Sequence, residues 1–275
     1  MNAWAPSSPC TPDCLSRGAP RAPVGRVLRR AAALTRTVAG ATAGPHRITE
    51  PPAVRDRAQA VLDALDIRLD RGGGPLSAPG RAGTLIVANH ISWLDIVALL
   101  AVEPVTMLAK RQVGEWPLIG TLARRTGTLF IDRDSLRGLP GTVAEISALL
   151  RAGRSLMVFP QGATWCYGTG GPFRRATFQA ALDAGAPIRP VTLDYFQRDA
   201  PSTAAAFLGD DDFASSLRRV LRAADLSIRV TVHHPLHPDP THDTRRTLAT
   251  RARAIVAGPA PHAGGRAGAG CTEVL

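Results

Sequence analysis

The chain has 275 residues, 45% of them apolar, which is typical of a globular protein and enough for one sizeable core. No stretch approaches the roughly 20 consecutive apolar residues that span a bilayer, and the first residues lack the charged start and apolar centre of a secretory signal, so we expect a cytoplasmic protein. The formal net charge is +11, almost all of it arginine because Lys110 is the only lysine. This balance suits partners that carry phosphate, including anionic lipid surfaces and nucleic acid, without choosing among them.

The first 45 residues are expected to form a basic tail, disordered up to about residue 24 because it is rich in Pro, Ser and Cys without periodicity. Residues 24–38 predict a short helix with arginines on one side and apolar residues on the other. Such a helix could lie on an anionic membrane or, equally well, pack on the domain. Residues 46–80 predict a helix running into a strand, followed from residue 71 by a linker rich in Gly and Pro.

Residues 81–257 are expected to form the main domain, and residues 258–275, rich in Gly, Ala and Pro, a loose tail. In the domain, strands are predicted at 84–88, 105–109, 128–131, 155–159, 188–194 and 226–232. Helices are predicted at 92–101, 114–124, 135–151, 174–184, 213–223 and 242–256. Strands interleaved with helices of this length predict an α/β layer structure with a largely parallel sheet.

No metal site is expected from the cysteines or the histidines. The four cysteines show no metal-type pairing, and neither a disulfide scaffold nor a zinc site is predicted from Cys10, Cys14, Cys166 and Cys271. Four histidines gather between residues 233 and 242, but the prolines among them hinder regular ligand geometry and no Cys or carboxylate pattern accompanies them.

The segment Asn89-His-Ile-Ser-Trp-Leu-Asp95 places a histidine and a carboxylate five residues apart, directly after the predicted strand 84–88. His90 therefore lies at the carboxyl end of a strand, the edge where ligands bind in open α/β sheets. Asp95, at the start of the next helix, could hold the imidazole in one tautomer for use as a general base. The same residues also fit a capping box, in which Ser92 begins the helix and Asp95 accepts from an end N–H.

Three more segments follow in order: Gly127-Thr-Leu-Phe-Ile-Asp-Arg133, Val158-Phe-Pro-Gln-Gly-Ala-Thr164 and Ile188-Arg-Pro-Val-Thr-Leu193. Together with the His90 segment they resemble the four ordered blocks of the glycerol-phosphate and lysophosphatidic acid acyltransferase family, often called PlsC-like. The resemblance covers roughly residues 81–195 and is specific because four blocks occur in the right order. It implies a mixed, largely parallel sheet flanked by helices, with an amino-terminal helical element.

The resemblance also implies the chemistry and the partners. His90 would be the base that deprotonates a lipid hydroxyl, Asp95 would orient it, and the acyl chain would pass directly from acyl-CoA or acyl-carrier protein to a lysophospholipid. No cofactor beyond that co-substrate is implied. The enzyme is expected at the cytoplasmic face of the membrane, bound peripherally to an anionic surface, and nucleic acid is not expected as a partner.

The remaining site residues follow from the same blocks. Arg133 would bind the acceptor phosphate, or else pair only with a neighbouring aspartate, and Lys110, at a strand end on the rim of His90, could touch phosphate as well. The turn at Gly162 could donate a backbone N–H to the oxyanion or be a plain tight turn. Structural roles in the motifs are assigned to Asn89, Ser92, Gly127, Phe130, Phe159, Pro160 and Pro190.

The third block departs from the family's usual Phe-Pro-Glu-Gly-Thr-Arg. Gln161 and Thr164 would contact the acceptor headgroup, but Gln161 keeps the reach of Glu without its charge, and Thr164 lacks a guanidinium that would clamp phosphate. Arg174 and Arg175 could replace that cation if their loop folds back. Three functions therefore stay open: acylation of 1-acyl-sn-glycerol-3-phosphate to phosphatidic acid, acylation of lyso-ornithine lipid or another lyso-lipid, and an inactive basic module that binds membrane or nucleic acid.

Overall fold

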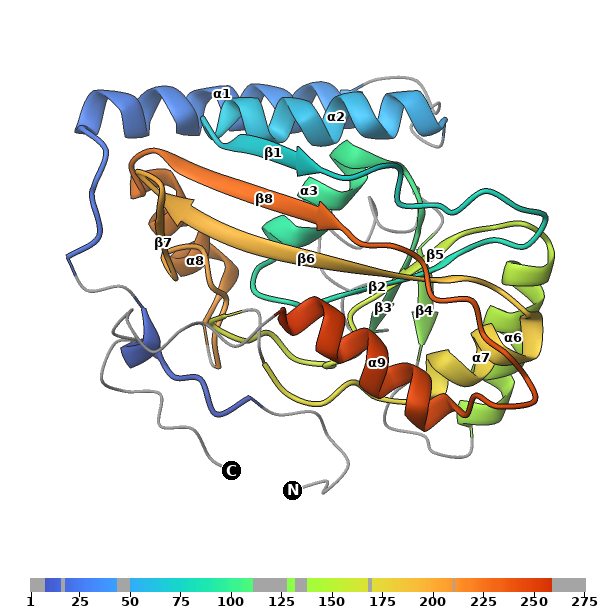
Figure 1. Cartoon of the computed structure of the whole chain (residues 1–275). Coiled ribbons are helices and arrows are strands. Elements are labelled where there is room, and N and C mark those ends of the chain that lie inside the picture. The colour runs from blue at the N-terminus through green and yellow to red at the C-terminus, as the bar shows by residue number, and fades with distance from the viewer. Residues whose placement is uncertain are drawn as a thin grey trace.

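A computed structural model describes residues 8–15, 18–43, 50–110, 128–131, 138–167, 170–209 and 211–258. Its centre is an eight-stranded sheet in the order β1-β8-β6-β2-β5-β3-β4, with β7 paired to β6 (Figure 1). The pairs β6/β8 and β6/β7 are antiparallel and the other pairs are parallel. The strands are β1 Arg68–Gly72, β2 Leu85–Ala88, β3 Thr106–Lys110, β4 Leu129–Ile131, β5 Leu156–Val158, β6 Ile188–Gln197, β7 Ala200–Pro201 and β8 Leu226–Val232.

Helices cover both faces of this sheet (Figure 1). The described part of the chain contains a 3₁₀ turn, η1 Pro12–Cys14, and the helices α1 Val24–Ala43, α2 Pro51–Ala64, α3 Leu94–Val102, α6 Leu139–Arg151, α7 Ala176–Ala184, α8 Phe213–Arg222 and α9 Arg245–Ala257. Residues of α2, α3 and α8 share one core with Ile86 and Ala88 of β2. Residues of α6, α7 and α9 share a second core with Leu85 and Val87. Because β2 is buried on both sides, its sequence is a continuous apolar run.

The predicted α/β class and the mixed, largely parallel sheet are confirmed. Most elements begin or end within a few residues of the prediction: α3 starts at Leu94 rather than at residue 92, and α9 starts at Arg245 because Thr244 forms a capping box with Thr247. Residues 71 and 72 belong to β1 and not to a linker. The helix predicted at 114–124 lies outside the described residues. Within the described ranges, no helix is both long enough and apolar enough to cross a membrane.

The amino-terminal segment is ordered in its described parts, so the prediction of disorder is wrong for residues 8–15 and 18–23. Cys10 is 4% exposed and belongs to the first core. The Gln197 side chain at the end of β6 donates to the carbonyls of Pro20 (3.1 Å) and Ala224 (2.9 Å), and Arg21 forms a β-bridge with Ala223. These residues follow the surface of the domain because their main-chain groups form hydrogen bonds with the side-chain amide of Gln197 and with the main chain at Ala223.

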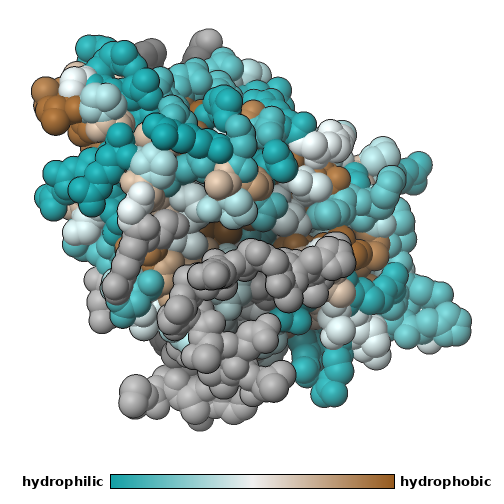
Figure 2. Space-filling model, turned by 60° about the vertical axis from the view of Figure 1, so that its left-hand side comes forward, coloured by the Kyte–Doolittle hydropathy of each residue, from teal (hydrophilic) through white to brown (hydrophobic). Residues whose placement is uncertain are grey.

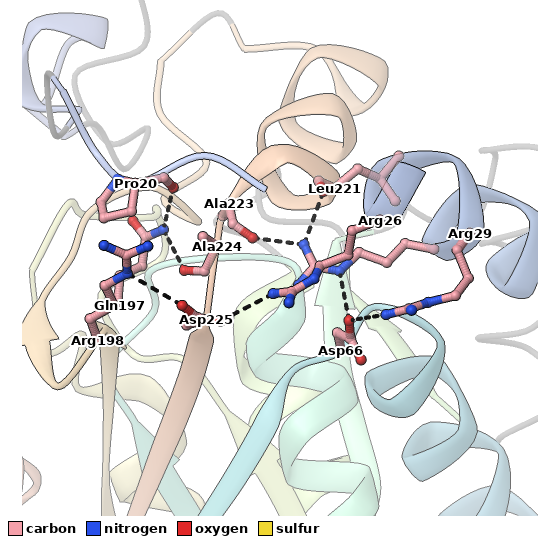
Figure 3. Close-up of polar contacts among 11 residues, drawn as sticks. Pro20, Arg26, Arg29, Asp66, Gln197, Arg198, Leu221, Ala223, Ala224 and Asp225 are labelled. Carbon is pink, nitrogen blue, oxygen red and sulfur yellow. Dashed lines mark hydrogen bonds and ion pairs between the residues drawn. The ribbon is translucent and has the colours of Figure 1, made fainter. Parts of the chain in front are cut away.

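The helix α1 packs on the domain through its arginines (Figure 3). Arg30 is 2% exposed, and its Nη1 donates to the carbonyls of Leu221 (3.0 Å) and Ala223 (2.7 Å). Its Nε and the guanidinium of Arg29 both reach Asp66, at 3.4 and 3.0 Å. Burial lowers the pKa of Arg30, and the negative charge of Asp66 partly offsets this decrease. A third arginine, Arg26, lies 3.2 Å from Asp225. Of the two alternatives for this basic helix, the structure therefore shows packing on the domain.

Two arginines that share Asp66 provide a matched pair of substitutions. Arg30→Ala is expected to lower the free energy of unfolding by ~2 kcal/mol, because two buried carbonyls lose their donor. Arg29→Ala removes a guanidinium that is 66% exposed, and such a surface pair contributes less than about 1 kcal/mol. Urea denaturation of both variants measures the difference, and equal losses would contradict the assigned role of Arg30.

Candidate active site

The site begins where β2 ends. Asn89 follows the strand directly, is fully buried, and forms two hydrogen bonds with the main chain of Leu193 in β6: Nδ2 donates to the carbonyl at 2.9 Å and Oδ1 accepts the N–H at 2.8 Å. A side-chain amide can satisfy both groups of one residue in this way. Asn89 thus ends the β2/β6 ladder and lets the chain leave the sheet at His90, as its predicted role in shaping the turn requires.

His90 and Asp95 lie in direct contact. Nδ1 of His90 is 2.8 Å from Oδ2 of Asp95, and the carboxylate side chain is fully buried while the imidazole is 19% exposed. The first turn of α3 carries Asp95, so the intervening residues Ile91, Ser92 and Trp93 form a tight loop that turns both side chains together. One face of the imidazole stacks on Phe159 from the third block, with ring centroids 4.0 Å apart.

Asp95 accepts hydrogen bonds from four directions. The main-chain N–H groups of Ile91 and Ser92 donate to Oδ2 at 2.7 and 2.9 Å, and the hydroxyl of Tyr195 donates to Oδ1 at 2.5 Å. A carboxylate that acts only as an acceptor requires the imidazole to carry its proton on Nδ1. Nε2 of His90 then holds a lone pair and can accept a proton. The two interpretations of the motif are compatible, because Asp95 also binds main-chain N–H groups beside the helix start.

Tyr195 was not predicted as part of the site. It lies in β6, about one hundred positions after Asp95, and is 4% exposed. Burial and the neighbouring charge of Asp95 raise the pKa of its hydroxyl well above the usual value, so the group remains a proton donor. The only hint in the sequence was a tyrosine in an apolar strand, since a buried phenol needs a hydrogen-bond partner.

Tyr195→Phe tests whether this hydroxyl positions the pair. We expect kcat to fall roughly tenfold, equivalent to ~1.4 kcal/mol, with KM unchanged because Tyr195 is buried and its hydroxyl is bonded to Asp95. Steady-state kinetics separates the two constants. A variant that lost thermal stability but kept the wild-type kcat would show that Tyr195 has only a structural role.

Gln161 binds the main chain of His90. Its Oε1 accepts the N–H of His90 at 2.8 Å, and the side chain is 6% exposed. A β-carbon on Gly170 would lie 2.1 Å from its Nε2, so a glycine is needed where the loop passes over it. This position therefore needs a hydrogen-bond acceptor rather than a charge, and glutamine can replace the family's usual glutamate. The contact of Gln161 with acceptor phosphate stays a prediction.

A matched pair of substitutions at this position tests that explanation. Gln161→Glu keeps an acceptor for the His90 N–H and is expected to stay within about twofold of wild-type activity. Gln161→Leu leaves the buried N–H without a partner, which costs about 1–3 kcal/mol; a loss of ~1.4 kcal/mol would lower kcat/KM about tenfold. If the leucine variant matched the glutamate variant in kinetic assays, the hydrogen bond would have no part in placing His90.

Gly162 and Thr164 both form hydrogen bonds with main-chain carbonyls of the protein. The N–H of Gly162 donates to the carbonyl of Phe159 at 3.1 Å and its φ is +78°, a conformation that favours glycine. Of its two predicted roles, the tight turn is the one observed. The hydroxyl of Thr164 donates to the carbonyl of Phe207, and its contact with the acceptor stays a prediction. The next residue, Trp165, donates its main-chain N–H to the carbonyl of His90 at 2.8 Å.

The predicted cations fall into three groups. Arg174 and Arg175 are exposed at the start of α7, and the N–H of Arg174 donates to the carbonyl of Pro160 at 2.8 Å. Their loop therefore does fold back onto the third block. Lys110 ends β3 beside β5, at the same edge of the sheet as His90, but its side chain is not described. Arg133 and Gly127 lie outside the described residues.

The remaining motif residues lie in the sheet or next to it. Phe130 lies in β4 opposite Ala109, Pro160 is buried directly after β5, and Pro190 is buried opposite Val87 in the β2/β6 pair. The carbonyl of Pro190 accepts the N–H of His233 at 3.0 Å. Ser92 is fully buried, and its hydroxyl accepts the N–H of Leu94 at 3.3 Å. These contacts agree with the structural roles predicted for the four residues.

The sequence shows no metal-type pairing of the cysteines, but the fold brings three of them together. The sulfur atoms of Cys10, Cys14 and Cys166 all lie within 4.8 Å of one another. A hydrogen bond from the Cys166 thiol lowers the pKa of Cys10 to about 6. The same contact, with burial, raises the pKa of Cys166. Of the four clustered histidines, His233 binds the Thr192 hydroxyl through Nε2 at 2.8 Å.

Comparison with known proteins adds to this geometry. The acyltransferase family model matches residues 73–194. A 1-acyl-sn-glycerol-3-phosphate acyltransferase of Neisseria meningitidis serogroup B is 37% identical over 179 residues, which cover 65% of this chain and 69% of that protein. A lyso-ornithine lipid O-acyltransferase of Pseudomonas aeruginosa is 40% identical over 158 residues, 57% of this chain and 60% of that protein. The crystal structure of the 1-acyl-sn-glycerophosphate acyltransferase PlsC of Thermotoga maritima matches with a TM-score of 0.58 at 16% identity, covering 85% of this chain and 92% of that one, and it shows the fold alone.

Proposed function

The chain belongs to the acyltransferase family, and on that basis we propose that it transfers a fatty acyl chain from a thioester to the free hydroxyl of a lysophospholipid. The observation that carries the proposal is the contact between His90 and the buried Asp95, at 2.8 Å, on the carboxyl edge of the sheet. Among the described residues, His90 is the histidine whose ring pairs with a carboxylate and is partly exposed to solvent. The family and this geometry agree on the chemistry.

The reaction needs one base and one fixed electrostatic partner. Nε2 of His90 takes the proton of the lipid hydroxyl as its oxygen attacks the thioester carbonyl, and the imidazolium that forms is stabilised by Asp95. The tetrahedral intermediate then expels the thiolate, which recovers the proton from His90 and leaves as the free thiol. One ester bond forms and one thioester bond breaks. A thiolate is a good leaving group, so no acyl-enzyme is required.

The acceptor is proposed to be 1-acyl-sn-glycerol-3-phosphate, which gives phosphatidic acid. Support comes from the relative in Neisseria meningitidis and from the exposed Arg174 and Arg175, which directly precede α7 and whose loop folds onto the third block. Lyso-ornithine lipid is the second candidate because relatives of that name are equally similar. Gln161 no longer argues against a phosphate headgroup, since the position contacts the protein main chain.

The enzyme is further proposed to work at an anionic membrane surface on the cytoplasmic side. Figure 2 shows a hydrophilic surface interrupted by an apolar patch at one end of the molecule. Val24 and Leu28, at the start of α1, are 75% and 65% exposed. They are four residues apart and therefore lie next to each other on one face of the helix. Contact with lipid would bury them, and the net charge of +11 would add electrostatic attraction.

Single-turnover assays with purified protein test these proposals. The donors are acyl-CoA and acyl-carrier protein, and the acceptors are lysophosphatidic acid, lyso-ornithine lipid and other lyso-lipids. Transfer to lysophosphatidic acid supports the first acceptor, and transfer only to another lyso-lipid supports the second. No transfer to any lipid from either donor would overturn the enzymatic proposal and favour a basic module that binds membrane or nucleic acid.

A further inference from the structure

The three grouped cysteines come from two distant parts of the chain. Cys10 lies two residues before η1, Cys14 is the last residue of η1, and Cys166 lies in the loop after β5. The two buried sulfur atoms of Cys10 and Cys166 are 3.1 Å apart, and the half-buried Cys14 places its sulfur within 4.8 Å of both. Two thiols and the sulfur of the disulfide-bonded Cys14, drawn from segments more than 150 residues apart, form a cluster that chain proximity alone does not explain.

Main-chain and hydroxyl hydrogen bonds help to hold the cluster in place. The 3₁₀ turn is closed by the N–H of Cys14 donating to the carbonyl of Thr11 at 2.9 Å, which turns Cys10 and Cys14 toward one point. The hydroxyl of Thr203 donates to the carbonyl of Cys14 at 2.8 Å. The N–H of Cys166 donates to the sulfur of Cys10 at 3.3 Å, and such a bond favours a thiolate that binds a metal.

The arrangement matches what a soft metal ion requires. Zinc binds cysteine sulfur at about 2.3 Å in a tetrahedron, which separates the sulfur atoms by roughly 3.8 Å, and its structural ligands commonly come as pairs with two to four residues between them. Cys10 and Cys14 have three residues between them. The sulfur atoms of Cys10 and Cys166 are 3.1 Å apart and the other separations are at most 4.8 Å, so movements of about 1 Å would place the three sulfur atoms at three corners of the tetrahedron and leave the fourth corner for a further ligand.

We propose that Cys10, Cys14 and Cys166 bind one zinc ion, which joins the amino-terminal segment to the loop beside the catalytic histidine. Cys14 is disulfide-bonded in this structure, so the site belongs to the reduced protein. The ion has a structural role. Cys166 directly follows Trp165, whose main-chain N–H binds the carbonyl of His90, and metal binding therefore restricts the loop on which His90 depends.

Metal analysis of the full-length protein, purified under reducing conditions without chelators, tests the proposal. Elemental analysis is expected to find about one zinc per chain. The variants Cys10→Ser, Cys14→Ser and Cys166→Ser should each lose most of it. Thr11→Ala is the matched control, because Thr11 is exposed between two of the ligands and its side chain forms no cap hydrogen bond; it should keep the metal.

Cobalt substitution covers the case in which a cysteine variant does not fold. Wild-type protein loaded with Co²⁺ should show the absorption of thiolate-to-cobalt charge transfer, and zinc should abolish it. Reduced wild-type protein without zinc and without this absorption would overturn the proposal, as would zinc retained by all three serine variants. A failure of the proposed acyl transfer would leave both readouts unchanged, so the two proposals are tested separately.

Discussion

His90→Ala is expected to lower kcat by about 10²- to 10⁴-fold, the range that a positioned general base supplies. The bond from Nδ1 of the imidazole to Asp95 leaves Nε2 available as a proton acceptor. The side chain lies at the end of β2 and is partly exposed, so the fold is expected to tolerate its loss. Single-turnover rates at saturating donor and acceptor measure the effect.

The control for this substitution is His242→Ala. His242 is exposed in the segment before α9 and has no contact with the catalytic pair. Its removal should leave the rate and the melting temperature unchanged. A correctly folded His90→Ala protein with the full wild-type rate would refute the catalytic assignment.

Asp95→Asn is expected to have the second largest effect, a loss of about 10²- to 10⁴-fold, because it removes the orientation and charge on which the base depends. The carboxylate accepts from His90, Ile91, Ser92 and Tyr195. An asparagine offers one acceptor oxygen and turns an NH₂ group toward the remaining donors, so at least one donor is left unpaired. If the amide donates to Nδ1 of His90, the proton moves to Nε2 and the base is lost.

Both the rate and the stability of this variant should be measured. The unpaired buried donor is expected to cost about 1–3 kcal/mol of folding free energy, which urea denaturation reports. Asp70→Asn provides the comparison, since Asp70 is 67% exposed and pairs only at 3.4 Å with Arg229. Catalysis by Asp95→Asn at the wild-type rate would mean that His90 does not need the carboxylate, and the proposed mechanism would fail.

The matched substitutions at Gln161 connect the catalytic residues to the departure in the third block. The block places Phe159 on the ring of His90 and the oxygen of Gln161 on its main-chain N–H. One short segment therefore contacts the histidine through both its side chain and its backbone. A change from glutamate to glutamine keeps both contacts, which explains how the block can vary while the catalytic pair stays intact.

The amino-acid sequence by itself determined what depends on neighbouring residues. The run from Leu85 to Ala88 is apolar throughout, so β2 had to be a buried strand, and the five-residue spacing from His90 to Asp95 spans one loop and one helical turn. The order of the four blocks indicated the family and the mixed sheet. These signals were reliable because strand burial and helix starts are set within a few residues of each other along the chain.

Only the tertiary structure decided the contacts between distant segments. Tyr195 reaches Asp95 because β6 pairs with β2, and Gln161 faces the His90 main chain because β5 lies on the other side of β2. Likewise α1 turned its arginines to the domain because buried carbonyls and Asp66 accept from Arg30. Cys10, Cys14 and Cys166 lie close together because the amino-terminal segment packs against the loop after β5. A linear pattern carries no record of which strands pair, and pairing is what brings these side chains within hydrogen-bond reach.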